Sequence, residues 1–166
     1  MKTTRRIAGR KAQHSGAAFE AMFLNACTFQ GIVCTRIPDG CKQLPNNKLI
    51  RQKTPFDWVI SIDSDTALID TKSIDNHRFP HSLIDPAQAL KLVRHDHKGT
   101  PSGYCVWLKK ADALIYIPAR LLCLAMQRPG SIGTDTPGIT LLGSPTAPNL
   151  RQIFNANAPE PATISP

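Results

Sequence analysis

Apolar residues follow a helical period in the N-terminal part of the chain, beginning near Ser15. The residues that recur at this spacing are Ala18, Phe19, Met22, Phe23, Ala26 and Cys27. Because spacings of three and four residues place side chains on one face of a helix, the pattern predicts an amphipathic helix. Ser15 or Gly16 can open this helix, and Gly31 can end it. Residues 1–14 show no apolar period, so we expect a flexible polar arm there.

Short runs rich in β-branched residues follow this helix and predict strands. The first run covers residues 32–37, and we expect a polar loop over residues 38–54. Residues 57–61 and 66–72 form two further runs, which are joined by the turn-forming residues 63–65. This arrangement predicts a β-hairpin.

The second half of the chain alternates between the two periods. Residues 86–97 predict a helix with a proline in its first turn, and residues 118–126 predict another. Between them, residues 104–108 and 113–117 predict two strands. The order helix, strand, hairpin, helix, strand, strand, helix predicts an α/β fold with a central mixed β-sheet flanked by helices.

The end of the chain differs in composition from the rest. It holds seven of the fourteen prolines, and residues 138–143 are a candidate edge strand. From Asn155 onward there are too few apolar residues to offset the entropy of ordering, so we expect the last dozen residues to be disordered. The chain thus divides into a basic arm at 1–14, one domain at 15–128 and a partly disordered extension at 129–166.

The charge of the chain favours a polyanionic partner. The formal net charge is +8 and the isoelectric point is about 9.5, which suits nucleic acid or an anionic membrane surface. No apolar run approaches the ~20 residues that cross a bilayer, and no basic amphipathic helix is evident. The basic start is not followed by a hydrophobic stretch. We therefore expect a cytoplasmic protein without a membrane partner.

The cysteines do not indicate a disulfide framework or a zinc ribbon. There are five of them, an odd number, and none forms a CxxC pair. A metal site could be assembled from Cys34, Cys41, His77 and His81. Their spacing matches no common ligand pattern, so reduced thiols are the preferred interpretation.

Two carboxylates and a lysine in the predicted hairpin are candidates for chemistry. The hairpin can bring Asp57 and Asp70 side by side, and Asp70 and Lys72 share a face because strand side chains alternate. Charged groups near a core must be paired or metal-bound, and divalent cations held by carboxylates are common in phosphodiester hydrolysis. The structural alternative is a surface ion pair between Asp70 and Lys72, which contributes little to stability.

These residues form a longer pattern that resembles the PD-(D/E)xK nucleases. Asp57 is followed by twelve residues and then by Asp70-Thr71-Lys72, and Pro55-Phe56-Asp57 is a near version of the first half of the motif. Four blocks narrow the resemblance to RecU-type Holliday junction resolvases: GAAFEAMFLNAC, TPFDWVISIDSDTALIDTKSI, RFPHSLIDPAQALKL and SGYCVWLKKADALIYIPA.

The resemblance implies a restriction-endonuclease-like fold and a magnesium-dependent endonuclease, with manganese as a substitute ion. Its catalytic residues would be Glu20, Asp57, Asp70, Lys72 and Gln88. Asp57 and Asp70 would be the principal metal ligands, with the Thr71 carbonyl as a further ligand. Glu20 would support the ion directly or through water. Lys72 would orient the attacking water or stabilise charge on the phosphate.

Three features leave alternatives open. Gln88 could hold the water or a ligand through its amide, or it could be an ordinary exposed helix residue. Asp70 stands where the family more often has glutamate. The segment between Ile37 and Pro55 is also too short for the long stalk that RecU-type proteins insert into a junction, which puts junction preference in doubt more than cleavage.

The expected partner is DNA, most specifically four-way junctions, bound by a homodimer in which each subunit nicks one strand. Basic residues that could contact phosphate are Arg5, Arg6, Arg10, Lys11, Arg36, Lys48, Arg51 and Lys53. One alternative is a restriction-like or repair nuclease that acts on duplex DNA. Another is a catalytically silent DNA-binding relative, against which the intact Asp57, Asp70 and Lys72 argue.

Overall fold

The centre of the molecule is a six-stranded mixed β-sheet. The computed structural model describes residues 2–43, 49–52 and 54–156. The strands in spatial order are β1 (Val33–Arg36), β4 (Trp58–Ile62), β5 (Asp65–Ile74), β7 (Ser102–Leu108), β8 (Ala113–Pro118) and β10 (Thr140–Gly143). The pair β5 and β7 is parallel, and the other pairs are antiparallel. The predicted α/β fold with a mixed sheet is confirmed.

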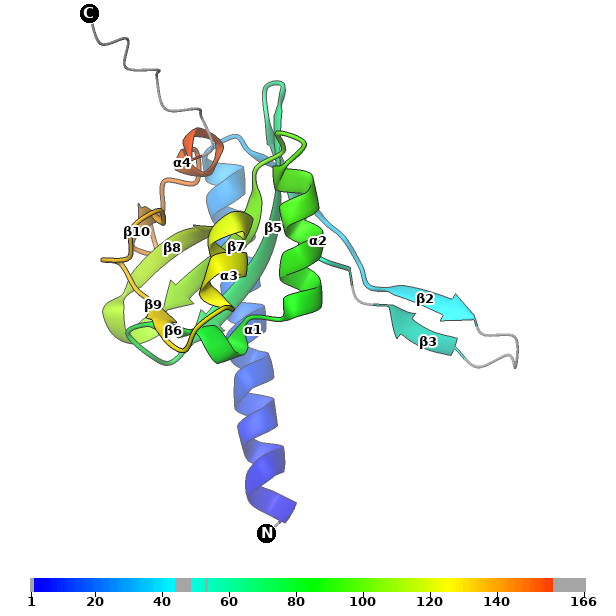
Figure 1. Cartoon of the computed structure of the whole chain (residues 1–166). Coiled ribbons are helices and arrows are strands. Elements are labelled where there is room, and N and C mark those ends of the chain that lie inside the picture. Colours follow the sequence, from blue (N-terminus) through cyan, green and yellow to red (C-terminus); the bar gives the residue numbers. More distant parts are fainter. Residues whose placement is uncertain (1, 44–48, 53, 157–166) are drawn as a thin grey trace, which may run out of the picture.

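Helices cover both faces of this sheet (Figure 1). The long helix α1 (Lys2–Phe29) and the short α4 (Gln152–Asn155) pack on one face, whereas α2 (Pro86–Asp96) and α3 (Ala119–Ala125) pack on the other. Successive residues of β5 serve the two cores in turn. Ile69 belongs to the cluster under α1, and Leu68 belongs to the cluster under α2 and α3.

The helix α1 is longer than the sequence pattern indicated. Its backbone is helical from Lys2, so residues 2–14, predicted as a flexible arm, continue the helix. Figure 1 shows this part extending past the sheet. The segment contains three Arg, two Lys, two Ala and no proline, and these residues favour a helix without an apolar period.

The hairpin predicted over residues 57–72 is confirmed. Strands β4 and β5 pair antiparallel with Trp58 opposite Ile69, and Asp63 takes a positive φ of 52° in the turn between them. Asp57 precedes β4 by one residue, so it lies at the end of the hairpin where the ladder stops.

A second hairpin replaces the predicted polar loop over residues 38–54. The strands β2 (Gly40–Gln43) and β3 (Leu49–Gln52) pair antiparallel in a sheet of their own. They project sideways from the body of the molecule (Figure 1). The loop prediction was wrong here because the segment lacks the long apolar alternation that marks a strand packed on a core.

The connection from β5 to its parallel neighbour β7 carries α2. The chain passes through β6 (Phe79–Pro80) and a short 3-10 turn (His81–Leu83) before α2 begins at Pro86. The side chain of Asp85 caps this helix by accepting hydrogen bonds from the backbone N–H groups of Ala87, at 3.0 Å, and Gln88, at 3.2 Å. The helix predicted to start at Pro86 is therefore confirmed, and Gln88 lies in its first turn.

Much of the C-terminal extension belongs to the same core. The strand β9 (Ser131–Ile132) pairs with β6, and β10 closes one edge of the central sheet, as predicted for residues 138–143. Leu142, Leu150 and Ile153 are buried under the α1 side of the sheet. The expected disorder starts at Asn155, which ends α4, and residues 157–166 lie outside the described part. Among the described helices, none is long and apolar enough to cross a membrane.

Candidate active site

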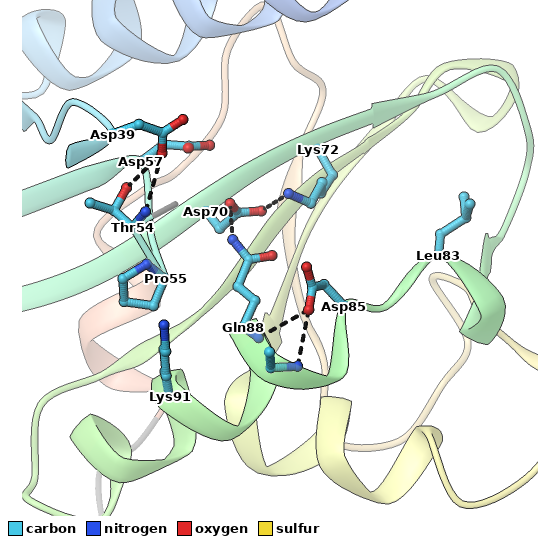
Figure 2. A pocket seen from close by; sticks show the side chains of 11 residues that line it. Asp39, Thr54, Pro55, Asp57, Asp70, Lys72, Leu83, Asp85, Gln88 and Lys91 are labelled. Atoms are coloured by element: carbon cyan, nitrogen blue, oxygen red, sulfur yellow. Dashed lines mark hydrogen bonds and ion pairs between the residues drawn. The ribbon is translucent and has the colours of Figure 1, made fainter. Parts of the chain in front are cut away.

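A cavity of about 360 Å³ opens beside the ends of β4 and β5 and the first turns of α2 (Figure 2). The residues that line it are Asp39, Thr54, Pro55, Asp57, Asp70, Lys72, Leu83, Asp85, Ala87, Gln88 and Lys91. Four of the five predicted catalytic residues are in this set: Asp57, Asp70, Lys72 and Gln88. They come from three elements and converge because the hairpin and the β5–α2–β7 crossover meet here.

Asp57 is fixed by its own backbone and by its side chain. Its N–H donates to the carbonyl of Ile69 at 3.0 Å, and its carbonyl accepts from the N–H of Ile37 at 2.8 Å. Its Oδ2 accepts hydrogen bonds from the N–H of Thr71 at 3.2 Å and from the Thr71 hydroxyl at 3.3 Å. The carboxylate is thus held across the hairpin and lines the same cavity as Asp70.

Thr71 acts through its side chain as well as its backbone. Its hydroxyl accepts a hydrogen bond from Trp58 Nε1 at 3.3 Å while donating to Asp57. This relay links a buried tryptophan under α1 to a carboxylate in the cavity. The sequence predicted the Thr71 carbonyl as a metal ligand, and that role stays a prediction.

Asp70 is a buried carboxylate in the middle of β5, with only 1% of its surface exposed. Its Oδ1 accepts a hydrogen bond from Gln88 Nε2 at 2.6 Å, and its Oδ2 forms an ion pair with Lys72. Apart from this ion pair, no described residue donates a hydrogen bond to Oδ2. Burial raises the pKa of Asp70 to about 7, against the opposing charge of Lys72, and Asp57 adds to the rise.

Lys72 shares the face of Asp70, as the alternation along the strand predicted. Its side chain is about one-third exposed, so the ammonium reaches both the buried carboxylate and the open cavity. Nζ lies 5.1 Å from the centroid of the Tyr104 ring. A cation at this distance from an aromatic face is stabilised by the ring. The ammonium is therefore held by a carboxylate and a ring.

Gln88 is oriented by a buried tyrosine. Tyr104 is fully buried in β7, directly opposite Asp70 in the parallel register. Its hydroxyl donates to Gln88 Oε1 at 2.7 Å, which leaves the Gln88 NH₂ group to donate to Asp70. Burial raises the pKa of Tyr104, so the hydroxyl keeps its proton. Gln88 is accordingly part of the cavity network rather than an ordinary exposed helix residue.

The donor set fits a magnesium ion. Within the described residues, no three His, Cys, Asp or Glu side chains gather closely enough to hold a metal ion by themselves. Magnesium needs fewer protein ligands, because it binds one or two carboxylates and keeps several waters. Asp57 and Asp70 supply carboxylate oxygens of this kind at one cavity, and Lys72 is the one polar partner of Asp70 Oδ2 among the described residues.

No protein-family profile and no curated protein matches this chain. One solved structure that is similar to it is Hjc, a Holliday junction resolvase from the archaeal hyperthermophile Archaeoglobus fulgidus. The two are 19% identical, the match covers 63% of this chain and 78% of that chain, and the TM-score is 0.46. The likeness is therefore partial.

Glu20, the fifth predicted catalytic residue, is not among the cavity residues. It lies on α1 and forms an ion pair with Arg36 of β1 at 2.9 Å. The guanidinium of Arg36 also lies 5.8 Å from the centroid of the Trp58 ring. Helical spacing placed Glu20 on α1 correctly but could not tell how that helix is turned on the sheet. A role for Glu20 in binding the ion stays a prediction.

The structure places few of the predicted DNA contacts. Arg36 is mostly exposed but already paired with Glu20. Arg5, Arg6, Arg10 and Lys11 belong to the helical backbone of α1, and Arg51 belongs to β3, but the positions of their side chains are not described. Lys48 and Lys53 lie outside the described residues. These contacts stay predictions.

Three charged cavity residues were missed by the sequence analysis. Asp39 joins the two ends of the projecting hairpin, because its Oδ1 accepts from the Thr54 N–H at 3.1 Å and the Thr54 hydroxyl at 3.4 Å. Asp85 caps α2 at the cavity wall. Lys91 lies three residues after Gln88 and therefore shares its side of the helix. That spacing was the available signal for Lys91, whereas no local pattern points to Asp39.

Proposed function

We propose that this chain is a metal-dependent endonuclease that hydrolyses phosphodiester bonds in DNA. The observation that carries the proposal is the buried Asp70 carboxylate, whose Oδ2 is ion-paired with Lys72 at a cavity that Asp57 also lines. A buried ion pair is a poor device for stability, since desolvation costs about as much as pairing returns. A role in binding a metal ion and a phosphate accounts for the buried ion pair.

Each residue of the cavity has its own role in the proposed reaction. Asp57 and Asp70 would hold a magnesium ion. The ion would offset negative charge on the phosphate and lower the pKa of the attacking water. Manganese, with similar ligand preferences, would substitute. Lys72 faces the open cavity and stabilises negative charge that develops on the phosphate. Thr71 and Gln88 fix the two carboxylates, so little reorganisation is needed when the substrate binds.

We propose branched DNA, and four-way junctions in particular, as the substrate. Support comes from the resemblance to RecU-type resolvases. The segment between Ile37 and Pro55 is shorter than the stalk of that family, but it does form the projecting hairpin of β2 and β3. The hairpin is tied to the cavity at its base by Asp39 and Thr54, so an element that protrudes from the body starts beside the proposed active site. Two such sites in a homodimer would nick two strands symmetrically.

The test compares DNA forms, metal and variants in one assay. Purified protein is incubated with end-labelled four-way junction, duplex and single-stranded DNA, each with magnesium or with chelator. We expect the junction to be nicked in magnesium and to stay intact in chelator. Asp70→Asn should abolish it, and Lys72→Ala should slow it by ~10²–10³-fold, the cost of losing an electrostatic stabiliser. Lys110→Ala, a change at an exposed residue that does not line the cavity, is the control.

Each alternative has its own result in this assay. Nicking by Asp70→Asn at the wild-type rate, or by wild type in chelator, would contradict the proposed site. Equal cleavage of duplex and junction would indicate a restriction-like or repair nuclease. Tight junction binding without cleavage under any metal would indicate a catalytically silent DNA-binding relative.

A further inference from the structure

One side of α2 carries three exposed basic residues that continue from the cavity. They are Lys91, Arg94 and Lys98, spaced by three and four residues, so they form a stripe along one side of the helix axis. We call this set the α2 stripe. Gln88 precedes it by three residues, and Lys91 itself lines the cavity beside Pro55 (Figure 2). The stripe therefore begins inside the proposed active site and leads out of it.

The charges of the α2 stripe have no ion-pair partner in the part of the chain that the structure describes. Elsewhere, basic side chains such as Arg36, Lys72 and Arg78 are ion-paired. Among the described residues, no carboxylate forms an ion pair with any member of the stripe. The one acid of α2, Asp96, is five residues after Lys91, which turns it roughly 140° away around the helix.

Support of the helix dipole does not account for the stripe. Basic residues in the last turn of a helix stabilise it, and Arg94 is in that position. Lys91 is in the middle of α2, however, and Lys98 follows its last residue, Asp96, by two positions. Only one of the three charges is thus explained by helix stability.

The stripe is held in a fixed position relative to Asp57. The rings of Phe56 and His95 meet edge to face, with 5.9 Å between their centroids and 88° between their planes. His95 is four residues after Lys91, so it lies beside the stripe, and Phe56 immediately precedes Asp57. A phosphate bound on α2 would therefore keep a defined distance from the proposed metal ligands.

We propose that the α2 stripe binds consecutive backbone phosphates of the cleaved DNA strand, on one side of the scissile phosphate. The proposal rests on the proposed function, since it assumes that the scissile phosphate lies at Asp70 and Lys72. Lys91 and Lys98 are separated by ~10.5 Å along the axis at the usual rise per residue. Phosphates of one strand rise by ~3.4 Å along the axis but lie farther apart because the strand winds around it, so the stripe can face two or three of them.

Two acids also line the cavity. Asp39 lies at the base of the projecting hairpin, and Asp85 caps the N-terminal end of α2, the end away from Arg94 and Lys98. A polyanionic strand is repelled by these carboxylates and attracted by the stripe. The charges therefore favour a path along the C-terminal half of α2.

The test is a salt series with a charge-matched control. Junction binding is measured in an Asp70→Asn background without magnesium, so that no cleavage occurs. One variant carries Lys91→Gln, Arg94→Gln and Lys98→Gln. Its control carries Lys110→Gln, Arg120→Gln and Arg128→Gln, which are equally exposed and outside the cavity. Circular dichroism verifies that both are folded.

We expect the α2 variant to flatten the slope of log affinity against log salt by about 0.9 for each lost contact, hence by about 1.8 to 2.7 for two or three contacts. The control should leave the slope nearly unchanged. An unchanged slope in the α2 variant, or equal flattening in both variants, would overturn the proposal.

Phosphate ethylation locates the contact. In the parent protein, ethylation of two or three consecutive phosphates on one side of the nick should block binding, and the α2 variant should be insensitive to them. Interference scattered over all arms in both proteins would overturn the proposal. Failure of the proposed function gives a different result. The wild-type protein would then not cleave DNA in magnesium, whereas the binding results above would be unchanged.

Discussion

At the scale of single residues, opposing effects act on the ionisation of Asp70. Burial opposes its ionisation, while Lys72 and the amide of Gln88 favour it. The result is a pKa of about 7 in the folded chain against an ordinary value of 3.8. Because the folded pKa is the higher one, the stability that this residue contributes is present below about pH 4 and is lost as the pH rises through 7.

We therefore predict that Asp70→Asn stabilises the metal-free protein above pH 7. Asparagine can still accept the hydrogen bond from Gln88 but carries no charge to bury. One pKa unit corresponds to ~1.4 kcal/mol, so the gain should be on the order of a few kcal/mol at pH 8 and should shrink toward pH 4. Urea unfolding in chelator at both pH values measures it. The exposed Asp75→Asn is the control. A gain of equal size at both pH values would contradict the argument.

A second prediction concerns Tyr104, which touches no substrate but orients Gln88. Tyr104→Phe removes the donor to Gln88 Oε1, so the amide can turn its carbonyl toward Asp70. Losing one hydrogen bond of about 1 kcal/mol should lower kcat by roughly fivefold to tenfold. The KM for DNA should stay unchanged, and the magnesium concentration for half-maximal rate should rise.

Tyr116→Phe is the matched control for this change. Tyr116 is also fully buried, and its hydroxyl has no hydrogen-bond partner within the described residues. Its loss should leave kcat and the magnesium requirement unaltered. If both phenylalanine variants lower kcat equally, the effect of Tyr104 is one of packing and not of orientation.

At the scale of elements, each group of the proposed active site is placed by a different connection. The tight β4–β5 hairpin places Asp57 beside Asp70, and strand alternation places Lys72 beside Asp70. The crossover through α2 brings Gln88 over the same face, and the parallel pairing of β5 with β7 sets Tyr104 opposite Asp70. The first two relations are local in the sequence. The last two depend on long-range packing.

The projecting hairpin leads to a prediction about substrate choice. Its ends are already closed by the hydrogen bonds from Thr54 to Asp39, so residues 40–53 can be replaced by a short Gly-Ser linker without moving the sheet. We expect the shortened protein to fold and to keep its cleavage of duplex or nicked DNA. Its preference for the four-way junction, measured as the ratio of junction to duplex rates, should fall toward one. An unchanged ratio would show that the hairpin does not select the branch.

At the scale of the whole molecule, the order of elements was predictable because helical and strand periods are local signals. The central sheet, the β4–β5 hairpin and the starts of α2 and α3 followed from them. Asp57, Asp70 and Lys72 could be grouped in advance for the same reason, since one hairpin carries all three. No pairing beyond that hairpin was needed.

The parts that were missed depend on contacts between distant segments. The pairing of β6 with β9 joins residues some fifty positions apart through two residues on each side, too few for any pattern. The bond from Tyr104 to Gln88 is similar, because a tyrosine in an apolar strand is indistinguishable from core. Glu20 shows the same limit, since sequence gives a residue its place along a helix but not the rotation of that helix on a sheet.

The C-terminal segment supplies the last prediction, because the structure makes it part of the core. Gln30, just after α1, accepts the N–H of Leu150 at 3.0 Å and donates to the carbonyl of Pro148 at 2.6 Å. Leu142, Leu150 and Ile153 are buried, and each contributes about 1.5–3 kcal/mol. Their sum is comparable with the 5–15 kcal/mol that stabilises a typical domain.

A chain that ends at Gly130 should therefore be unfolded or nearly so, whereas a chain that ends at Ala156 loses no described contact and should match the full-length protein in urea. Ile153→Ala gives the graded case, since deleting a buried isoleucine costs about 2–5 kcal/mol and should lower the urea midpoint without changing the slope. Equal midpoints for the full chain and the chain that ends at Gly130 would show that residues 15–128 fold alone. Since α1 packs on the same core as Ile153, the Ile153→Ala variant should also show faster amide exchange around Phe19 and Phe23.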